Sequence, residues 1–417
     1  MELKRVVVTG VGAITPIGST APEYFEGLKS GRSGAASITR FDASKFKTQF
    51  ACEVKDYNQE DFFDRKEARK LDLCAQFGII AADEALADSK LDQFDFNKDR
   101  AGVIWGSGIG GLHTFQTECV NFANGDGTPR FNPFFIPKMI ADITPGHISI
   151  KHGLRGPNFA TVSACASSTH ALIDSFNYIR LGKADFIVSG GSEAAVCEAG
   201  VGGFNALHAL STNNDSPATA SRPFDKTRDG FVLGEGGACL ILEEYEHAKA
   251  RGAKIYAEVV GGGLTADAHH ITAPHPEGLG ASNVMRFALE DAHISPNDID
   301  YINVHGTSTS LGDIAESKAI QTVFGDHAYN LNISSTKSMT GHLLGAAGAI
   351  ESLACVLAIT EGVIAPTINF EHADEEIDQK LNFTFNKAQN KEVKYALSNT
   401  FGFGGHNASV IFKKYQA

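Results

Sequence analysis

The chain has 417 residues, with 36 Lys and Arg against 49 Asp and Glu, so its formal net charge is −13. Hydrophobic residues make up 43% and charged residues 20%, a composition that excludes intrinsic disorder and favours a globular chain. The negative balance gives no basis for binding nucleic acid or an anionic membrane surface. The length suits two to three domains, or two halves that share one interface.

Short apolar runs alternate with helical patterns along the whole chain. The expected strands are nearly continuous in apolar character, as strands covered on both faces tend to be. They are Arg5–Thr9, Gly102–Trp105, Phe186–Ser189, Cys239–Leu242, Ile255–Val260, Tyr301–Val304 and Val410–Phe412. The expected helices are Leu73–Leu86, Ala166–Arg180, Asn283–Asp291, Ile314–Phe324 and Leu343–Ile359. This alternation predicts an α/β layered fold.

A repeat is visible at long range. A G-x-G-G turn followed by an apolar strand occurs at Gly234–Gly237 and again, 168 residues later, at Gly402–Gly405. A similar offset separates the small-residue turn at Cys165 from the one at His342, and each precedes a helix. We therefore expect two α/β halves of similar design, residues 1–253 and 254–417.

Several features bear on the compartment. The seven cysteines are odd in number and none has zinc-ligand spacing, which fits a reducing cytosol. The first residues lack the apolar run of a signal peptide. The best apolar run, Leu343–Ile359, is interrupted by Glu351, and we expect a buried helix there and no membrane span.

Cys165 lies among small residues, Ser163-Ala-Cys-Ala-Ser-Ser168, at a predicted turn into a helix. The N–H groups and the positive dipole at a helix N-terminus favour a thiolate, so we expect a lowered thiol pKa there. The same N–H groups suit an oxyanion. The alternative is a buried structural cysteine, which describes most free cysteines.

Two histidines and a lysine form further candidates. His305 ends an expected strand before a Gly/Ser/Thr turn, and strand ends in α/β sheets are where ligands collect. Lys337 lies among hydroxyl residues, and His342 begins an apolar helix. A histidine at a helix N-terminus is disfavoured as a cation, so it stays neutral and can donate an N–H. The alternatives are a histidine satisfied within its turn and plain capping by the hydroxyls.

Two glycine-rich segments remain. Phe401–Asn407 combines dense glycine with aromatics, which suggests close backbone approach or a mobile gate, against the alternative of a plain turn. Gly106–Gly111 satisfies G-x-G-x-x-G after a strand, but the helix after it is poorly marked, so a dinucleotide site is not favoured. The sequence has no G-x-S-x-G elbow to support a serine hydrolase.

Together these segments resemble one family. Cys165 in S-A-C-A-S-S, His305 in V-H-G-T-S-T, Lys337 and His342 in S-T-K-S-M-T-G-H-L-L-G, and the closing F-G-F-G-G-x-N are similar to the elongating β-ketoacyl-acyl-carrier-protein synthases. Ile109 in G-S-G-I-G-G resembles their type II members. The resemblance runs nearly end to end, and it implies the thiolase-like fold: two duplicated α/β halves in five α-β-α-β-α layers, usually as a homodimer.

The resemblance implies an acyltransferase of type II fatty acid biosynthesis. Cys165 would take the acyl chain from an acyl carrier protein as a thioester, with the N–H groups of Cys165 and Phe403 as oxyanion hole. His305 and His342 would then stabilise malonyl carrier protein as it loses CO₂. Attack of the resulting carbanion would give a 3-oxoacyl product two carbons longer. No cofactor is required beyond the phosphopantetheine that the carrier bears.

Supporting roles are implied by the same resemblance. Lys337 would organise the site through a carboxylate, for which Glu316 is the matching candidate. The remaining substrate-binding and support residues are Ile109 in the acyl tunnel, Thr307 and Thr309 at the phosphopantetheine arm, Phe401, and Asp313. A structural K⁺ or Na⁺ site would use Asn303, Glu351 and Ser398.

The acyl carrier protein is acidic, so a chain at −13 needs a local basic patch to bind it. Arg65–Lys70 is net +3 and contains Lys66, Arg69 and Lys70, which match the family's docking segment; Arg130 adds to it. Its alternative is a solvated helix face. The sequence departs from the family at Phe131 and His208, where basic residues are common, and at His406, where threonine is common.

Three other functions share part of this pattern. A thiolase needs a second, C-terminal cysteine as base, but Cys355 lies within an expected helix and no cysteine follows it. A non-catalytic chain-length partner subunit would lack Cys165. A specialised synthase of a polyene or polyketide pathway would carry the same motifs, so it stays open. A cytoplasmic homodimer without nucleic-acid or membrane partners is the expectation.

Overall fold

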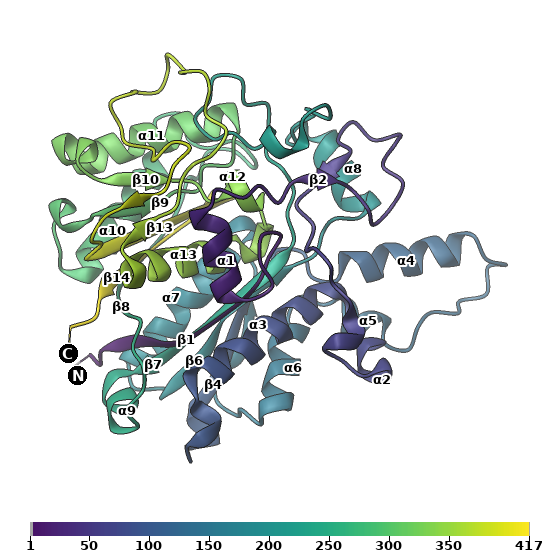
Figure 1. Ribbon diagram of the computed structural model, residues 1–417. Helices are drawn as coiled ribbons and strands as arrows, with labels where there is room; N and C mark the ends of the chain where they lie inside the picture. Colours follow the sequence, from purple (N-terminus) through teal and green to yellow (C-terminus); the bar gives the residue numbers. More distant parts are fainter. Residues whose placement is uncertain (1–2, 417) are drawn as a thin grey trace.

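The computed structural model describes residues 3–416 of the chain (Figure 1). Ten strands form one continuous sheet, and two small two-stranded sheets flank it. The first five strands of the large sheet are β1 (Val6–Ile14), β4 (Ala101–Gly106), β5 (Asn158–Thr161), β6 (Phe186–Glu193) and β7 (Gly236–Glu244). The second five are β8 (Ala257–Ala266), β9 (Tyr301–Asn303), β10 (Asn332–Ser334), β13 (Tyr395–Gly402) and β14 (His406–Lys414). The small sheets pair β2 (Ala36–Ser37) with β3 (Phe50–Ala51), and β11 (Val363–Ile364) with β12 (Gln389–Asn390).

The helices follow the same division. The N-terminal half contains α1 (Ala21–Lys29), α2 (Arg65–Ala68), α3 (Leu73–Ser89), α4 (Leu112–Ala123), α5 (Phe135–Met139), α6 (Ile143–His152), α7 (Ser167–Arg180), α8 (Glu198–Ala206) and α9 (Tyr245–Ala250). The C-terminal half contains α10 (Leu279–Ala292), α11 (Ser310–Phe324), α12 (Lys337–Thr340) and α13 (Ala347–Glu361).

The strand order shows the duplication directly. From its edge inward the N-terminal half reads β5-β4-β6-β7-β1, and the C-terminal half reads β10-β9-β13-β14-β8. The pairings agree as well, with two parallel and then two antiparallel pairs in each half. The halves meet where β1 pairs with β8, from Val6 opposite Val259 to Val8 opposite Ala257. The repeat predicted from the two G-x-G-G turns is thus a repeat of five-stranded units.

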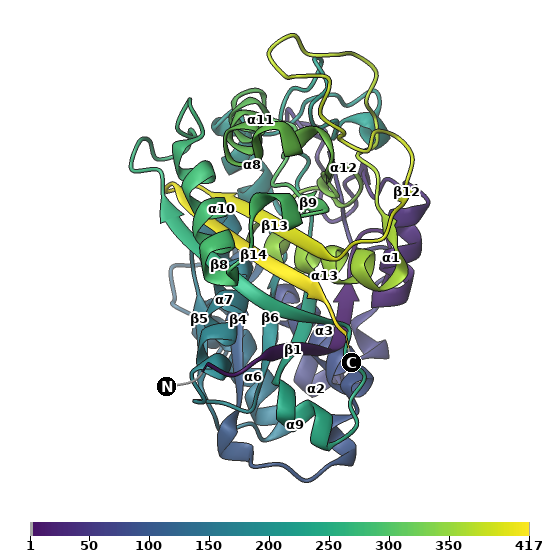
Figure 2. The same ribbon diagram turned by 90° about the vertical axis from the view of Figure 1, so that its left-hand side faces the viewer.

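Helices cover both faces and fill the space between the halves (Figures 1 and 2). α3 and α6 pack on the outer face of the N-terminal strands, and α10 and α11 pack on the outer face of the C-terminal strands. α7 and α13 lie between the two halves in one shared apolar core, which includes Leu172 and Leu353. The arrangement is the five-layered α-β-α-β-α fold that the resemblance implied.

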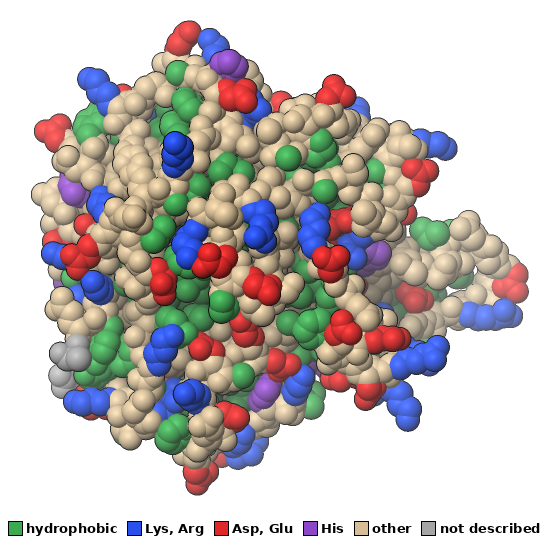
Figure 3. All heavy atoms as spheres, viewed as in Figure 1, with side chains coloured by type: hydrophobic (Ala, Val, Ile, Leu, Met, Phe, Trp, Pro, Cys, Tyr) green, Lys and Arg blue, Asp and Glu red, His purple; other side chains and the backbone are tan. Residues whose placement is uncertain are grey.

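Most expected elements are present within a few residues of their predicted ends. The structure adds elements that the sequence signals did not mark, among them β5, β13, α4 and α6. α4 directly follows the Gly106–Gly111 turn, so a full helix is present where the sequence marks one only poorly. Its exposed Phe115, Val120 and Phe122 obscure the apolar stripe by which a surface helix is recognised. α4 and the loop after it project from the body of the molecule (Figures 1 and 3).

The apolar run near the C-terminal half is a core helix. Leu344–Glu361 is long and apolar enough to cross a membrane, but 89% of this window is buried inside the protein. It comprises a 3₁₀ turn, Leu344–Ala346, followed by α13. The expected buried helix is therefore present.

Candidate active site

Cys165 is presented by a strained turn between β5 and α7. Ala164 has a left-handed backbone with φ of 50°, which few residues other than glycine adopt, and Ala164–Ala166 then forms one 3₁₀ turn before the helix. The turn places Cys165 at the N-terminal end of α7, as its small-residue neighbours predicted. The side chain is buried but borders the main cavity of the protein.

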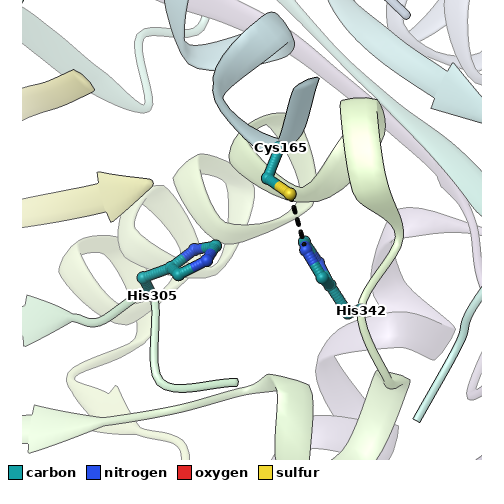
Figure 4. Close-up of side chains that lie close together, drawn as sticks. All are labelled: Cys165, His305 and His342. Atoms are coloured by element: carbon teal, nitrogen blue, oxygen red, sulfur yellow. Dashed lines mark hydrogen bonds between the residues drawn. The ribbon is translucent and has the colours of Figure 1, made fainter. Parts of the chain in front are cut away.

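Two histidines face this thiol from the other half of the chain (Figure 4). The Nε2 atom of His342 lies 3.0 Å from the sulfur of Cys165. The rings of His305 and His342 have centroids 5.4 Å apart and are nearly perpendicular, at 88°. One ligand-type atom from each of the three residues lies within 4.8 Å of the others. The three residues selected from separate motifs therefore form one cluster.

Burial sets the protonation of all three groups. It lowers the pKa of His305 and of His342 well below the usual histidine range, and the Lys337 ammonium lowers both further. Both imidazoles are neutral near pH 7, as predicted for His342. Burial raises the pKa of the Cys165 thiol to about 12, although the Lys337 charge and the Phe403 N–H act in the opposite direction. The expected lowered thiol pKa is therefore not found: desolvation outweighs the groups that favour the thiolate.

Lys337 pairs with a carboxylate other than the expected one. Its ammonium forms a buried ion pair with Glu351 of α13. Glu316 instead accepts the backbone N–H groups of His305 and Gly306, at 2.9 and 2.8 Å. Glu316 thus fixes the backbone at one candidate histidine, and Lys337 acts on it through its charge, which lowers the Glu316 pKa. The prediction that Glu316 is the direct partner of Lys337 was wrong.

Asp313 supports the neighbouring turn. Its carboxylate accepts the N–H of Ser308 at 3.2 Å and that of Phe224 at 2.9 Å, and it lies 3.4 Å from the Arg228 guanidinium. Ser308 has a left-handed backbone, with φ of 68°, between the two candidate pantetheine residues. The hydroxyls of Thr307 and Thr309 lie 3.0 Å apart on the wall of the cavity. Asp313 therefore holds the turn that presents both threonines.

The C-terminal glycine segment closes over the cysteine turn. A Cβ at Gly402 would lie 2.8 Å from the carbonyl oxygen of Ser163 and 3.0 Å from the nitrogen of Cys165, so only glycine allows this approach. The approach brings the Phe403 N–H to the Cys165 sulfur, where it lowers the thiol pKa. Phe401, from the end of β13, lies against His305 with ring centroids 5.6 Å apart.

The cluster opens into a cavity of about 540 Å³. Its lining includes the hydroxyl residues Thr307 and Thr309, and also Ile109, Phe401 and Phe403. Sequence reasoning missed several apolar lining residues, which are Phe204, Phe231 and Leu344. Phe231 contacts His342 edge to face, with centroids 5.3 Å apart. Its F-V-L-G-E-G-G context marks a strand and a turn but gives no sign that the side chain reaches a catalytic histidine.

The candidate cation residues share one buried region. Asn303 of β9 and Ser398 of β13 are directly opposite in parallel register. Among the described residues, the Asn303 Oδ1, the Ser398 hydroxyl and both Glu351 carboxylate oxygens are buried without a hydrogen-bond partner, apart from the ion pair of Glu351 with Lys337. Oxygen donors of this type fit a hard cation.

The candidate docking residues lie on exposed segments. Lys66 is on α2, whose N-terminus is capped by Asp64, and Arg69 and Lys70 follow directly. The Lys70 ammonium lies 5.6 Å from the centre of the Phe134 ring, which links this segment to the start of α5. Arg130 is separate from these three residues in sequence, on the exposed loop between α4 and α5.

Comparisons with known proteins agree with this geometry. Residues 3–248 match the model of the β-ketoacyl synthase N-terminal domain, and residues 256–371 match that of the C-terminal domain. The chain is 50% identical to 3-oxoacyl-[acyl-carrier-protein] synthase 2 of Synechocystis sp., over all of this chain and 99% of the relative.

Two solved structures extend the comparison. The ishigamide ketosynthase/chain length factor superposes with a TM-score of 0.91 at 36% identity, covering 99% of this chain and 100% of that one. A ketosynthase in complex with its type II polyketide acyl carrier protein gives 0.89 at 33% identity, with the same coverage. Both domain models match, the sequence identity to a relative reaches 50%, and the fold is duplicated. The chain therefore belongs to the β-ketoacyl synthase family.

Proposed function

We propose that the chain is an elongating 3-oxoacyl-acyl-carrier-protein synthase of type II fatty acid biosynthesis. The observation that carries this proposal is the Cys165–His342 contact of 3.0 Å, with His305 beside it, in a cavity that also carries two hydroxyls. A thiol with two neutral imidazoles suits acyl transfer followed by decarboxylation, and the set requires no added cofactor.

In the first half-reaction the Cys165 sulfur attacks the thioester carbon of acyl carrier protein. Because the thiol is protonated at neutral pH, its proton moves to the nearest base, the His342 Nε2 atom. The N–H groups of Cys165 and Phe403 stabilise the oxyanion that forms. The tetrahedral intermediate collapses, the pantetheine thiol leaves with that proton, and the acyl chain stays on Cys165.

In the second half-reaction malonyl carrier protein occupies the site. Neutral His305 and His342 each donate an N–H to the thioester oxygen, which becomes an enolate oxygen as CO₂ leaves. The enolate carbon attacks the Cys165 thioester and forms the new carbon–carbon bond. The Cys165 sulfur leaves and takes up one proton, so a 3-oxoacyl carrier protein two carbons longer is released.

The remaining cavity residues receive the substrate. The Thr307 and Thr309 hydroxyls bind the phosphopantetheine arm, and Phe403 gates the entrance to Cys165. Ile109 lines the acyl tunnel, and Phe401 packs on His305.

Carrier protein docks on Lys66, Arg69 and Lys70, with Arg130 contributing. Replacing the first three by glutamate weakens carrier binding and reduces its salt dependence, because fewer charge pairs are then screened. Glutamate at Lys318 of α11, an exposed lysine outside the docking segment, is the matched control. Equal affinity in the triple variant and the control would remove this segment from the proposal.

A second copy of the chain completes the assembly. β5 is the outermost strand of the large sheet, so one of its edges is unpaired in the single chain. Near it Ile150 and Val162 are 81% and 61% exposed. Pairing of β5 with β5 of the second copy covers this strand edge and the side chains of Ile150 and Val162. Sedimentation of the wild type as a monomer, or of Val162→Lys as an unchanged dimer, would contradict this.

Three further expectations remain proposals. Asn303, Glu351 and Ser398 bind a structural K⁺ or Na⁺, supported by their buried, unpartnered oxygens. The halves divide at residues 253 and 254, supported by the position of this segment between α9 and β8. The enzyme acts in the cytoplasm.

A specialised polyene or polyketide ketosynthase is the second candidate, because the ketosynthase of a type II polyketide system superposes closely at 33% identity. Purified protein supplied with acyl and malonyl carrier proteins should form 3-oxoacyl carrier protein over a range of saturated chain lengths. Condensation restricted to polyenoyl or polyketide carriers would favour the second candidate. Condensation by Cys165→Ala would contradict the nucleophile assignment.

A further inference from the structure

Glu193 is a buried carboxylate that the mechanism above does not use. It is the last residue of β6 and is fully buried. Its two oxygens accept backbone N–H groups from Gly108 at 2.7 Å, Ile109 at 3.2 Å, Gly110 at 3.3 Å and Gly345 at 3.0 Å, and the Ser107 hydroxyl at 3.3 Å.

These donors come from two distant segments. One is the Gly106–Gly111 turn after β4, and the other is the turn that joins His342 to α13. Burial raises the pKa of the Glu193 carboxyl while the four N–H groups lower it, and no basic side chain is among its main influences. Backbone dipoles, which favour the ionised form, therefore bind this carboxylate.

Two glycines are required by this contact. A Cβ at Gly108 would lie 2.8 Å from the Glu193 Oε2 atom, and a Cβ at Gly345 would lie 2.7 Å from the same atom. The N–H groups of the G-x-G-x-x-G turn thus bind an anion, and this anion is the Glu193 carboxylate of the protein itself. This occupancy accounts for the motif without a dinucleotide.

Both segments also line the substrate cavity. Gly108 and Ile109 form part of one wall, and His342 and Leu344 form part of another. Glu193 is the side chain whose hydrogen bonds join the two segments directly. The separation of Ile109 from Leu344 is therefore set by this carboxylate together with the direct packing of Gly345 on Gly108.

We propose that Glu193 is a positioning residue for acyl-chain selection: it fixes the Ile109 turn against the Leu344 turn and so limits which chains Cys165 accepts. The inference rests on the proposed role of Ile109 in the acyl tunnel. It assigns no chemical step to Glu193, whose charge acts on the Cys165 thiol only by raising its pKa.

The test is Glu193→Gln, with acylation of Cys165 measured by intact mass for short-, medium- and long-chain acyl carrier proteins. The amide keeps the shape but places an NH₂ group against the N–H donors. Without the hydrogen bonds to the Glu193 carboxylate, the Ile109 turn moves. The ratio of Cys165 acylation between the best and the worst chain length then falls by about tenfold, as expected for a lost charged hydrogen bond. A uniform loss at all lengths, or an unchanged profile, would overturn the proposal.

Glu84→Gln is the matched control. The Glu84 carboxylate also accepts two backbone N–H groups, from Ala13 and Ala21, but it lies outside the cavity lining. Glu84→Gln should lower the free energy of unfolding without changing the chain-length profile of Cys165 acylation. If Glu193→Gln does not fold, Gly108→Ala disturbs the same carboxylate through its new Cβ and should flatten the profile likewise; an unchanged profile there would overturn the proposal.

Ile109→Ala distinguishes a failure of the proposed role of Ile109 from a failure of the inference about Glu193. A normal profile in Ile109→Ala would contradict the role of Ile109 in the proposed function. An altered profile in Ile109→Ala, with an unaltered one in Glu193→Gln, would overturn only the inference about Glu193.

Discussion

The Lys337–Glu351 ion pair offers a test in which stability and chemistry separate. Both side chains are almost fully buried. Removing one partner of a buried pair typically costs about 3–5 kcal/mol, because the other charge loses its compensation, whereas replacing both partners by apolar residues is often neutral or stabilising. Lys337→Met should therefore destabilise the protein, and Lys337→Met with Glu351→Met should recover most of the loss.

The size of the effect follows from the chain length. At about 2.1 cal/mol/K of unfolding entropy per residue, 417 residues give about 0.9 kcal/mol/K. A loss of about 3–5 kcal/mol then lowers the midpoint of thermal unfolding by roughly 3–6 °C. Calorimetry of the wild type, both single variants and the double variant measures this shift in the unfolding midpoint. A double variant no more stable than Lys337→Met would refute the reasoning.

The chemistry should not recover with the stability. The Lys337 charge lowers the pKa of the Cys165 thiol, so its removal raises that pKa and reduces the thiolate fraction at every pH. Alkylation by iodoacetamide should be slower in both the single and the double variant. Lys391→Met is the control, because Lys391 is a half-buried lysine that donates to Asp300, Asn330 and Asn332 away from the cavity. Wild-type alkylation in the double variant would show that Lys337 acts only on stability.

Three further outcomes are expected. His305→Ala and His342→Ala should each slow malonyl decarboxylation by about 10²–10³-fold, but only His342→Ala should also slow acylation, since of the two histidines it is His342 whose Nε2 atom lies 3.0 Å from the Cys165 sulfur; equal acylation defects would contradict this. Because burial lowers both histidine pKa values, decarboxylation at saturating substrate should show no acid limb near pH 6.5, while stability should fall as the pH drops below about 6.5, where the unfolded histidines take up protons. Replacing K⁺ and Na⁺ by a bulky organic cation should lower the unfolding midpoint of the wild type but not of Ser398→Ala; an equal drop in both would exclude a site at Ser398.

The order of elements and the residues of the candidate site were accessible from the sequence for a physical reason. Buried strands must be apolar, and the turns between them are made of small residues. The few larger polar residues at strand and helix ends are therefore easy to recognise. Cys165, His305 and His342 are of this kind. Their meeting in one place was not a local property, since it requires α7 and α13 to lie in the same layer.

What the sequence missed depends on contacts between distant segments. Glu351 lies within an apolar helix, where spacing alone does not show that it reaches Lys337 in place of Glu316. The thiol pKa was predicted from the helix N-terminus, but burial between the two halves dominates it. β5 is short and only partly buried, so its residues lack a continuous apolar pattern. The first two cases depend on contacts between separate elements, and the third on the short length and partial burial of the strand.

The duplication shows why only one of two equivalent turns carries a thiol. Ala164 and Leu344, 180 residues apart, are both left-handed, with φ of 50° and 48°, and each begins a 3₁₀ turn that leads into a central helix. The residue after each is Cys165 in one half and Gly345 in the other. A Cβ at Gly345 would lie 2.1 Å from the Gly108 nitrogen, so this position accepts no side chain. The same backbone turn therefore carries a thiol in the first half and, in the second, a glycine that packs directly on Gly108.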